Sequence, residues 1–437
     1  AAFGYAALGA NTTGASNIAM GYNALGSVTT ASYNVGIGQS AGGAITTGTK
    51  NVFMGFAAGD ATTTASNNIA VGYDALTANT TGYGNTAVGK DAMRLNTTGY
   101  YNSAYGYQAL ESNTTGLSNT AIGRNTLYAN TTASSNSALG YNALSANTTG
   151  SSNTAVGYIS LSANTTGTDN VAVGKDSLDS NTTGGGNVGI GSDALQGNVT
   201  GASNVAVGND ALKSNTVSGN VGVGNQALEA NTTGPQNTAV GYQALYSNTT
   251  ADKNTALGYT ALKMNTGSDN TAVGDRAMKA NTSGTRNAAL GRLALAANTT
   301  ASYNTAVGDT ALLTNTTGVS NTAVGYQALY DLTTGSNNTA LGRNAGVNAT
   351  GASCTFIGKD AGDNLTTGNH GLYVGQFSVA SSAGVNYEMV LSSDNTNRYG
   401  KGAGTAYIAP GGAGAYQYNN SSSWSQTSDE RLKKNIT

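Results

Sequence analysis

The sequence predicts an all-β protein, a parallel β-solenoid built from seventeen-residue coils. Three observations predict this fold: a glycine that recurs at a fixed spacing, apolar residues that alternate just before it, and an Asn-Thr-Thr-Gly phrase that follows it. A short period kept over most of a chain is typical of solenoids, because one coil cannot bury its apolar face alone.

The recurrent glycine runs from Gly4 to Gly375 in steps of seventeen, as from Gly89 to Gly106, apart from three steps of sixteen. The short steps fall after Leu212, after Leu262 and around 346–348. A residue lost from a strand would turn every later side chain to the opposite face, whereas a loss in a turn leaves the strands in register. We therefore expect the three losses to lie in turns.

The residues before the glycine alternate with a period of two, which predicts a strand. In the phrase NTAVG, for example, Thr86 and Val88 flank Ala87. We expect the valine, together with a leucine four positions after the glycine such as Leu110, to line one thin core. The alanine row would then face outward and offer a flat surface to another copy of the chain.

The Asn-Thr-Thr-Gly phrase, as at 147–150, predicts the turn of each coil. Asparagine bonds its own backbone in turns, and glycine accepts a positive φ without steric cost. Stacked coils would bring these asparagines into a column whose amides bond from one coil to the next.

The composition excludes several classes of partner. Charged residues are 9% of the chain and the net charge is -2, so no basic field exists to attract nucleic acid or an anionic membrane. The single Cys354 excludes an intramolecular disulfide framework, and no apolar run is long enough for membrane insertion or a leader. No cofactor and no metal site are expected. Because Ala1 opens in mid-coil, we expect the natural N-terminus to lie before it.

The repeat dissolves after Gly375, where alternating strands and Gly-rich turns replace it. We therefore predict a repeat shaft over 1–375, a small C-terminal β module over 376–427, and the start of a further segment over 428–437. One valine and one leucine are a thin core for a whole ordered coil, so we also expect a homo-oligomer.

The coils, with their small polar residue, alternating apolar residues and glycine, resemble the heads of trimeric autotransporter adhesins. This resemblance implies a left-handed parallel β-roll and a homotrimeric fibre, although the period is longer here.

The end of the chain, WSQTSDERLKKNI from Trp424 to Ile436, resembles the opening of the intramolecular chaperone domain of endosialidase-type phage tailspikes and tail fibres. In that family the domain trimerises the fibre and then cuts itself off beside a serine, assisted by a lysine. The resemblance places these roles on Ser428 and Lys433, in a full-length precursor only. The chain itself is not expected to be an enzyme.

An aromatic residue often follows the recurrent glycine. The candidate binding residues of this kind are Tyr107, Tyr141, Tyr158, Tyr242 and Tyr259. Exposed rings would stack on host sugars, or would instead pack against neighbouring coils or a partner chain.

A second candidate is a column of carboxylates, Asp176, Asp193 and Asp210, which occupy the same position in successive coils. Closely spaced carboxylates suit glycoside cleavage or cation binding. The alternative is a solvated stripe of charge.

These observations predict a structural and host-attachment protein, a trimeric phage tail fibre that binds the bacterial surface and is matured by removal of the chaperone. Its partners would be further copies of itself, a bacterial cell-surface glycan or protein receptor, and other virion tail proteins through the missing N-terminus. The expected location is the extracellular virion tail, or alternatively the outer surface of a bacterium. The alternatives are a bacterial trimeric surface adhesin and a capsule-degrading tailspike enzyme.

Overall fold

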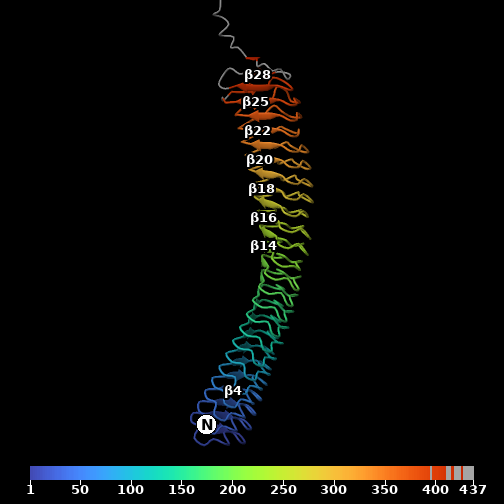
Figure 1. Ribbon diagram of the computed structural model, residues 1–437. Coiled ribbons are helices and arrows are strands. Elements are labelled where there is room, and N and C mark those ends of the chain that lie inside the picture. Colours follow the sequence, from blue (N-terminus) through green and yellow to red (C-terminus); the bar gives the residue numbers. More distant parts are fainter. Residues whose placement is uncertain (394–395, 410–414, 418–424, 427–437) are drawn as a thin grey trace, which may run out of the picture. The chain divides into compact units, whose positions relative to one another are not determined.

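The computed structural model describes residues 1–393, 396–409, 415–417 and 425–426, and every regular element in these ranges is a β-strand. The chain forms two compact units, Ala1–Asn220 and Val221–Thr437. Within each unit the strands stack one above the next (Figure 1). The described ranges contain no helix with the length and apolarity needed to cross a bilayer.

The strands are short, and most contain three residues. Those of the first unit are β1 (Ala2–Phe3), β2 (Ile18–Met20), β3 (Val35–Ile37), β4 (Val52–Met54), β5 (Ile69–Val71), β6 (Thr86–Val88), β7 (Ser103–Tyr105), β8 (Thr120–Ile122), β9 (Ser137–Leu139), β10 (Thr154–Val156), β11 (Val171–Val173), β12 (Val188–Ile190) and β13 (Val205–Val207). Those described in the second unit are β14 (Val221–Val223), β15 (Thr238–Val240), β16 (Thr255–Leu257), β17 (Thr271–Val273), β18 (Ala288–Leu290), β19 (Thr305–Val307), β20 (Thr322–Val324), β21 (Thr339–Leu341), β22 (Thr355–Ile357), β23 (Leu372–Val374), β24 (Ser378–Val379), β25 (Met389–Ser392), β26 (Arg398–Tyr399), β27 (Ala406–Ala409), β28 (Ala415–Gln417) and β29 (Ser425–Gln426).

Neighbouring strands from β1 to β13, and from β14 to β23, pair in parallel at an offset of one coil. In β10 and β11, for example, Thr154 pairs with Val171 and Ala155 with Ala172, each with its equivalent in the next coil. Equivalent side chains therefore form columns along each unit, with steps of about 4.8 Å. This register confirms the predicted parallel β-solenoid of 17-residue coils.

The shorter coils keep this register. β16 and β17 pair Thr255 with Thr271, and β21 and β22 pair Thr339 with Thr355, so equivalent residues still pair although each offset is one shorter. The missing residue falls outside the strands in both cases, which confirms the prediction for these two coils.

The core is lined by the alanine in the middle of each strand and by the leucine, not by the valine. Ala155 and Leu161 have no exposed surface, whereas Thr154 and Val156 lie half-buried on the outer face. The prediction that the alanines face outward is therefore wrong. The reason is the width of the coil, because the leucine side chain fills the space opposite the strand and leaves room there for little more than a methyl group.

Two larger residues in the strand show how narrow the core is. Where Phe53 replaces the alanine, the leucine positions beside it hold Gly42 and Gly59. A Cβ atom at Gly42 would lie 2.8 Å from the Phe53 ring, and one at Gly59 2.6 Å from it. The same exchange surrounds Phe356, which has Gly346 in a neighbouring leucine position.

The recurrent glycine follows each strand at a φ that other residues rarely adopt. Gly106 has φ 139°, and a Cβ atom there would lie 2.5 Å from the carbonyl oxygen of Gly123 in the next coil. The chain then enters the left-handed region without glycine, at Gln108 and Leu110, both with φ 54°. This conformation costs roughly 1–2 kcal/mol per residue. Hydrogen bonds between coils, such as that from Leu110 N–H to the Thr126 carbonyl oxygen (2.9 Å), offset the cost.

Two columns of buried asparagines run beside the core. In the predicted column, Asn113 Nδ2 donates to Asn96 Oδ1 in the preceding coil at 2.7 Å, which confirms amide bonding between coils. The sequence does not predict the second column, formed by the asparagine before each strand. There Asn119 Nδ2 donates to the Ala133 carbonyl oxygen (2.9 Å), and Asn119 Oδ1 accepts the backbone N–H of Asn136 (3.0 Å).

The parallel ladder continues beyond Gly375. Leu372 of β23 pairs with Met389 of β25, and Met389 pairs with Ala406 of β27, again at an offset of one full coil. β28 then pairs antiparallel with β27 and with β29, and β24 pairs with β26 in a separate sheet. β25 and β27, which lie in the predicted module 376–427, thus extend the ladder of the shaft.

Candidate binding surface

The five candidate tyrosines lie outside the core, in the column that follows the recurrent glycine. The exposed fraction of each side chain is between 39% for Tyr141 and 55% for Tyr259. They occupy this column because the chain turns at the glycine, directly after the strand, and places the next side chain on the surface. We refer to this column as the aromatic column; in the first unit it runs through Phe56, Tyr73, Lys90, Tyr107, Arg124, Tyr141, Tyr158 and Lys175.

The faces of these rings are largely covered by their neighbours. The rings of Tyr141 and Tyr158 stack with centroids 5.4 Å apart, as do those of Tyr242 and Tyr259. Tyr107 lies between two cations, with Lys90 Nζ 5.4 Å and the Arg124 guanidinium carbon 5.6 Å from its centroid. The column therefore presents ring edges, hydroxyl groups and cations to a ligand, and offers few free faces for stacking. Binding by the five tyrosines stays a prediction.

The two cations in the middle of the column differ in their pairing. Lys90 Nζ lies 3.2 Å from an Asp91 carboxylate oxygen, and this hydrogen bond raises the pKa of Lys90. Arg124 forms no ion pair with any residue in the described part of the chain. Its guanidinium edge therefore stays available beside the rings of Tyr107 and Tyr141.

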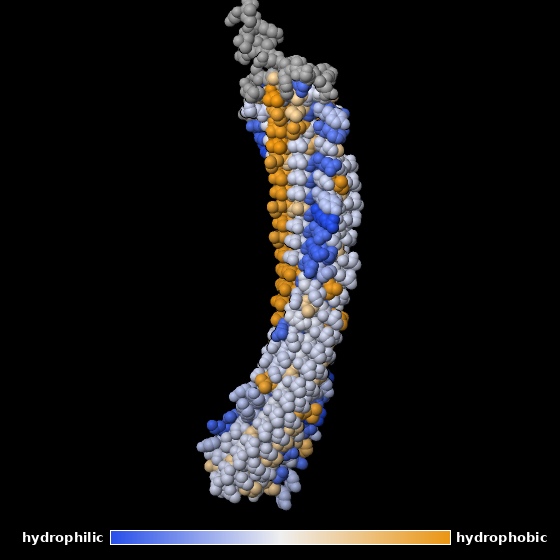
Figure 2. Space-filling model, in the orientation of Figure 1, coloured by the Kyte–Doolittle hydropathy of each residue, from blue (hydrophilic) through white to orange (hydrophobic). Residues whose placement is uncertain are grey.

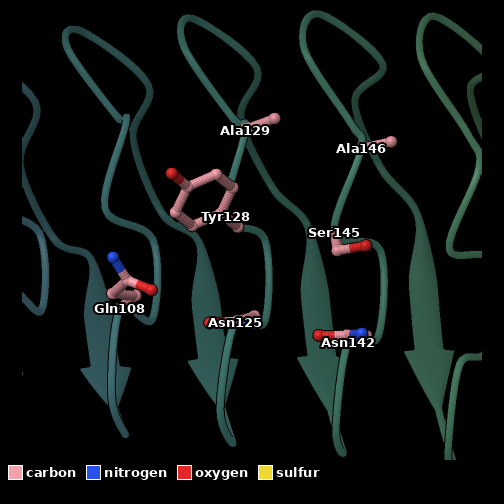
Figure 3. A pocket seen from close by; sticks show the side chains of 7 residues that line it. All are labelled: Gln108, Asn125, Tyr128, Ala129, Asn142, Ser145 and Ala146. Carbon is pink, nitrogen blue, oxygen red and sulfur yellow. The ribbon is translucent and has the colours of Figure 1, made fainter.

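Beside the aromatic column lies a hollow of about 370 Å³ on the turns that follow β7, β8 and β9 (Figure 3). We call it the amide groove, and it is lined by Gln108, Asn125, Tyr128, Ala129, Asn142, Ser145 and Ala146. Gln108, Asn125 and Asn142 occupy one column, the second residue after the glycine, at φ between 52° and 54°. Tyr128 and Ser145 occupy another, the fifth residue after it.

Two polar atoms of the amide groove lack partners. Asn125 Oδ1 and Asn142 Oδ1 are buried, and neither accepts a hydrogen bond from any described residue. A buried acceptor without a donor costs about 1–3 kcal/mol, which a ligand donor would recover after a side-chain rotation brings the oxygen to the surface of the groove. Tyr128 is 39% exposed, and no ring or cation in the described ranges stacks on it. Nothing in the sequence singles out these residues in advance, because both columns change residue type from coil to coil.

The three predicted carboxylates lie in the same column as Asn125, in later coils, and lysines neutralise them. Asp176 is 3.1 Å from Lys175 Nζ, and Lys213 Nζ is 2.9 Å from Asp210 and 3.7 Å from Asp193. No group of three His, Cys, Asp or Glu side chains suited to a metal ion occurs in the residues that the structure describes. The column has the character of a paired charged stripe.

A buried carboxylate at the C-terminal end of the described chain has a structural arrangement. Glu388 accepts the Tyr373 hydroxyl (3.2 Å) and the backbone N–H groups of Ser381 (3.0 Å) and Gly402 (2.8 Å). Burial raises the pKa of Tyr373 far above its ordinary value, and the negative charge of Glu388 beside the hydroxyl raises it further. These bonds hold the turns of the last coils together.

The predicted self-cleavage pair, Ser428 and Lys433, lies outside the described residues, as does the segment 428–437 that contains it.

No family model matches this chain, and neither does any curated protein or any solved structure.

Proposed function

We propose that the chain is a structural attachment protein, a segment of a homotrimeric bacteriophage tail fibre that presents binding surfaces to the bacterial envelope. The observation that carries this proposal is an exposed apolar column on the strand face of each unit. A surface of this kind favours association with further copies, and association multiplies weak contacts to a cell surface.

The apolar column consists of the third residue of each three-residue strand from β2 to β23, together with the equivalent Leu391 of β25. In the second unit it contains Val223, Val240, Leu257, Val273, Leu290, Val307, Val324, Leu341, Ile357, Val374 and Leu391. Figure 2 shows an uninterrupted hydrophobic stripe along this unit, and Leu257, Leu290 and Leu341 in it are 46–51% exposed. In the first unit the same column includes Met20, Met54, Ile122 and Leu139, which are also exposed.

The size of the column suits a second copy of the chain as its occupant. Ten coils at about 4.8 Å each give a strip on the order of 50 Å long, and a three-residue strand is about 10 Å wide. Each unit therefore offers roughly 500 Å² of strand face, of the same order as the roughly 800 Å² per partner of a stable interface. This width includes the threonines on the other side of the buried alanines, which place a short, β-branched side chain on the face in most coils.

The trimer, the left-handed coil and the phage origin are taken from the two family resemblances. In this proposal the chaperone beyond the shaft assembles three copies and is then removed beside Ser428 with the help of Lys433. The fibre then acts outside the cell, in the virion tail, where other tail proteins and a bacterial glycan or protein receptor are its partners. A bacterial trimeric surface adhesin is the alternative within the same structural class.

The capsule-degrading alternative is less well supported. It relies on the carboxylates of Asp176, Asp193 and Asp210, and each of these lies within 4 Å of a lysine ammonium group. A glycosidase needs one protonated and one free carboxyl group on opposite sides of a sugar bond, and lysine pairing of all three favours neither arrangement.

The proposal is tested with the double variant Leu257→Asp/Leu290→Asp, in which two carboxylates interrupt the apolar column. We expect the wild-type chain to sediment as a trimer and to bind bacterial cells of its host, and the variant to sediment as a monomer. Cell binding by the variant should fall by a factor on the order of 10²–10⁴ because multivalency is lost. Sedimentation velocity and cosedimentation with a panel of bacterial strains measure both.

The matched control is Thr250→Asp/Ser283→Asp, which adds the same charge at exposed turns two coils apart. The control should remain trimeric and bind cells as the wild type does. A wild-type chain that stays monomeric at micromolar concentration would contradict the assembly, and a trimer that binds no strain would contradict attachment.

A further inference from the structure

We propose that the amide groove binds an uncharged, hydroxyl-rich glycan that runs along the stack of coils. This inference rests on the proposed attachment function and names the ligand class for one of its surfaces. It depends on the polarity of the groove, on the free ring of Tyr128 and on the spacing of the coils.

The polarity of the lining selects a neutral ligand that donates hydrogen bonds. The residues that line the groove carry amide, hydroxyl, methyl and aromatic groups and no charge. The two buried atoms without partners, Asn125 Oδ1 and Asn142 Oδ1, are both acceptors. They would repel a carboxylate or phosphate, and no carboxylate lines the groove to pair with a cation. Sugar hydroxyls supply donors without charge, and their remaining lone pairs suit the hydroxyl group of Tyr128. Ser145 Oγ donates to the Ser162 carbonyl oxygen (3.4 Å) and offers its own lone pairs to a sugar hydroxyl.

The ring of Tyr128 provides an apolar surface for a sugar ring. A matching set of residues in the second unit shows what would remove this surface. There Tyr246 occupies the position of Tyr128, and Lys263, one coil later, places its Nζ 5.7 Å from the Tyr246 centroid. In the first unit the position of Lys263 is held by Ser145, whose short side chain places no ring or cation on the face of Tyr128 toward that coil; Tyr128 is 39% exposed. Figure 3 shows Tyr128 and Ser145 on successive turns.

The amides around the two tyrosines also differ. Gln243 Nε2 donates to Gln226 Oε1 at 2.8 Å in the second unit, so these two amides bond to each other. In the first unit the same positions hold Asn125 and Gln108, and the Asn125 carbonyl oxygen has no donor among the described residues. The shorter asparagine therefore leaves an acceptor for a ligand.

The spacing of the coils matches the length of a sugar. Asn125 and Asn142 are equivalent residues of adjacent coils, which are about 4.8 Å apart, a distance close to the length of one pyranose ring. Successive sugars of a linear chain would therefore meet equivalent acceptors. A groove lined by residues from three successive coils accommodates a segment of such a chain.

The experiment measures glycan binding by the whole chain and by the variant Ser145→Lys, which copies the second unit and covers the Tyr128 ring. The probes are linear hexasaccharides of β-1,4-glucose, α-1,4-glucose, β-1,4-mannose and β-1,4-N-acetylglucosamine, with an oligogalacturonate as the acidic probe. Saturation-transfer NMR and calorimetry report binding. We expect the wild type to bind at least one neutral probe in preference to the acidic one, and Ser145→Lys to bind it about tenfold more weakly through loss of the ring contact and of a hydrogen bond.

The matched control is Ser162→Lys, the same substitution one coil further along the same column and outside the groove. It should bind the neutral probe as the wild type does. Tyr128→Ala is a second variant that removes the ring without adding charge, and it should weaken binding as Ser145→Lys does. Thermal unfolding of each variant shows whether the coils remain folded.

The inference is overturned if the wild type binds none of the neutral probes, or if Ser145→Lys and Ser162→Lys bind them equally. Cosedimentation with host cells separates this outcome from a failure of the proposed function. Attachment that is intact in both Ser145→Lys and Tyr128→Ala would leave the fibre proposal standing and exclude the amide groove as its glycan site.

Discussion

Inside a coil, equivalent positions hold nearly the same residue throughout both units, whereas outside they change from coil to coil. Ala155 and Leu161, for example, have counterparts of the same type in most coils. The column after the glycine instead passes from tyrosine and arginine in the first unit to Asp275, Arg292 and Asp309 in the second. Each inward alanine or leucine has to fit a slot of fixed width, and each buried asparagine has to complete hydrogen bonds, while each outward residue meets mainly solvent.

The aromatic residues inside a coil support this interpretation, because Phe53 and Phe356 come in coupled sets. Phe53 appears with Gly42 and Gly59, so the volume gained in the strand is removed at the leucine position. Outward exchanges need no such compensation: Ser145 and Lys263 occupy equivalent positions while the strands of both units keep the same register. Outward columns are therefore where chemistry can vary while the fold is preserved.

The largest effect is expected from a methyl group added at a recurrent glycine, where it would meet the backbone of the next coil. Gly106→Ala places a Cβ atom 2.5 Å from the carbonyl oxygen of Gly123, at φ 139°. Strain at this φ and overpacking against the backbone each cost about 1–3 kcal/mol, so the unfolding free energy should fall by about 4 kcal/mol. Urea denaturation followed by far-UV circular dichroism measures the loss.

Gly186→Ala is the outward counterpart of this variant. Gly186 also has a positive φ, 68°, but the nearest atom to its added Cβ would be Ser203 Oγ at 3.8 Å. Equivalent coils carry Ser152 and Asp169 there at φ 61° and 60°. Its cost should be no more than about 1 kcal/mol, and equal losses in the two variants would break the distinction between inward and outward positions.

Two leucines of the same coil provide the second comparison. Leu144 is fully buried and Leu139 is 47% exposed at the end of β9. Leu144→Ala should lower the free energy of unfolding by about 3 kcal/mol because of the cavity that it leaves. Leu139→Ala should change the free energy of unfolding of the single chain by no more than about 0.5 kcal/mol. Hydrogen exchange of the amides in residues 137–153 measures both. Under the proposed assembly, Leu139→Ala should weaken association, which sedimentation at decreasing concentration would detect.

The repeating period predicts the coil, its register and the turns, since a fixed glycine spacing and an Asn-Thr-Thr-Gly phrase leave few alternatives. It does not predict which face of the strand is inside. An alternation with a period of two allows either Ala155 or the pair Thr154 and Val156 to face inward. Hydrophobicity alone favours the arrangement with Thr154 and Val156 inside, because of the larger apolar side chain of Val156. The deciding factor is the narrow cross-section, set by Leu161 in a left-handed conformation that residue propensity does not favour for leucine.

The candidate surface is predicted less completely. The sequence indicates that tyrosines after the glycine form a column, but the covering of Tyr107 by Lys90 and Arg124 depends on side-chain positions in adjacent coils. The amide groove is not visible in the sequence, because it arises from the absence of a long side chain at Ser145 and the shortness of Asn125. Such features become apparent only when residues from neighbouring coils are placed side by side.

The smallest expected effect concerns an outward carboxylate that is only partly solvated. Burial, and to a lesser extent the charge of Asp74, raises the pKa of Asp60 above its ordinary value of 3.8. The folded chain therefore holds this proton more tightly than the unfolded chain, and ionisation at neutral pH costs stability. Stability should rise as the pH falls from 7 through the raised pKa, and the gain should be complete near 3.8. Asp60→Asn removes this penalty and should stabilise the chain at pH 7 by less than about 1 kcal/mol, with no advantage below pH 3.8.

Urea titrations at a series of pH values measure the difference, and Asp169→Asn, which removes an exposed carboxylate, controls for the change in net charge. If Asp60→Asn and Asp169→Asn gave the same pH profile, the column holding Asp60 would be as solvated as the outermost positions, and the boundary between inward and outward residues would lie deeper in the coil.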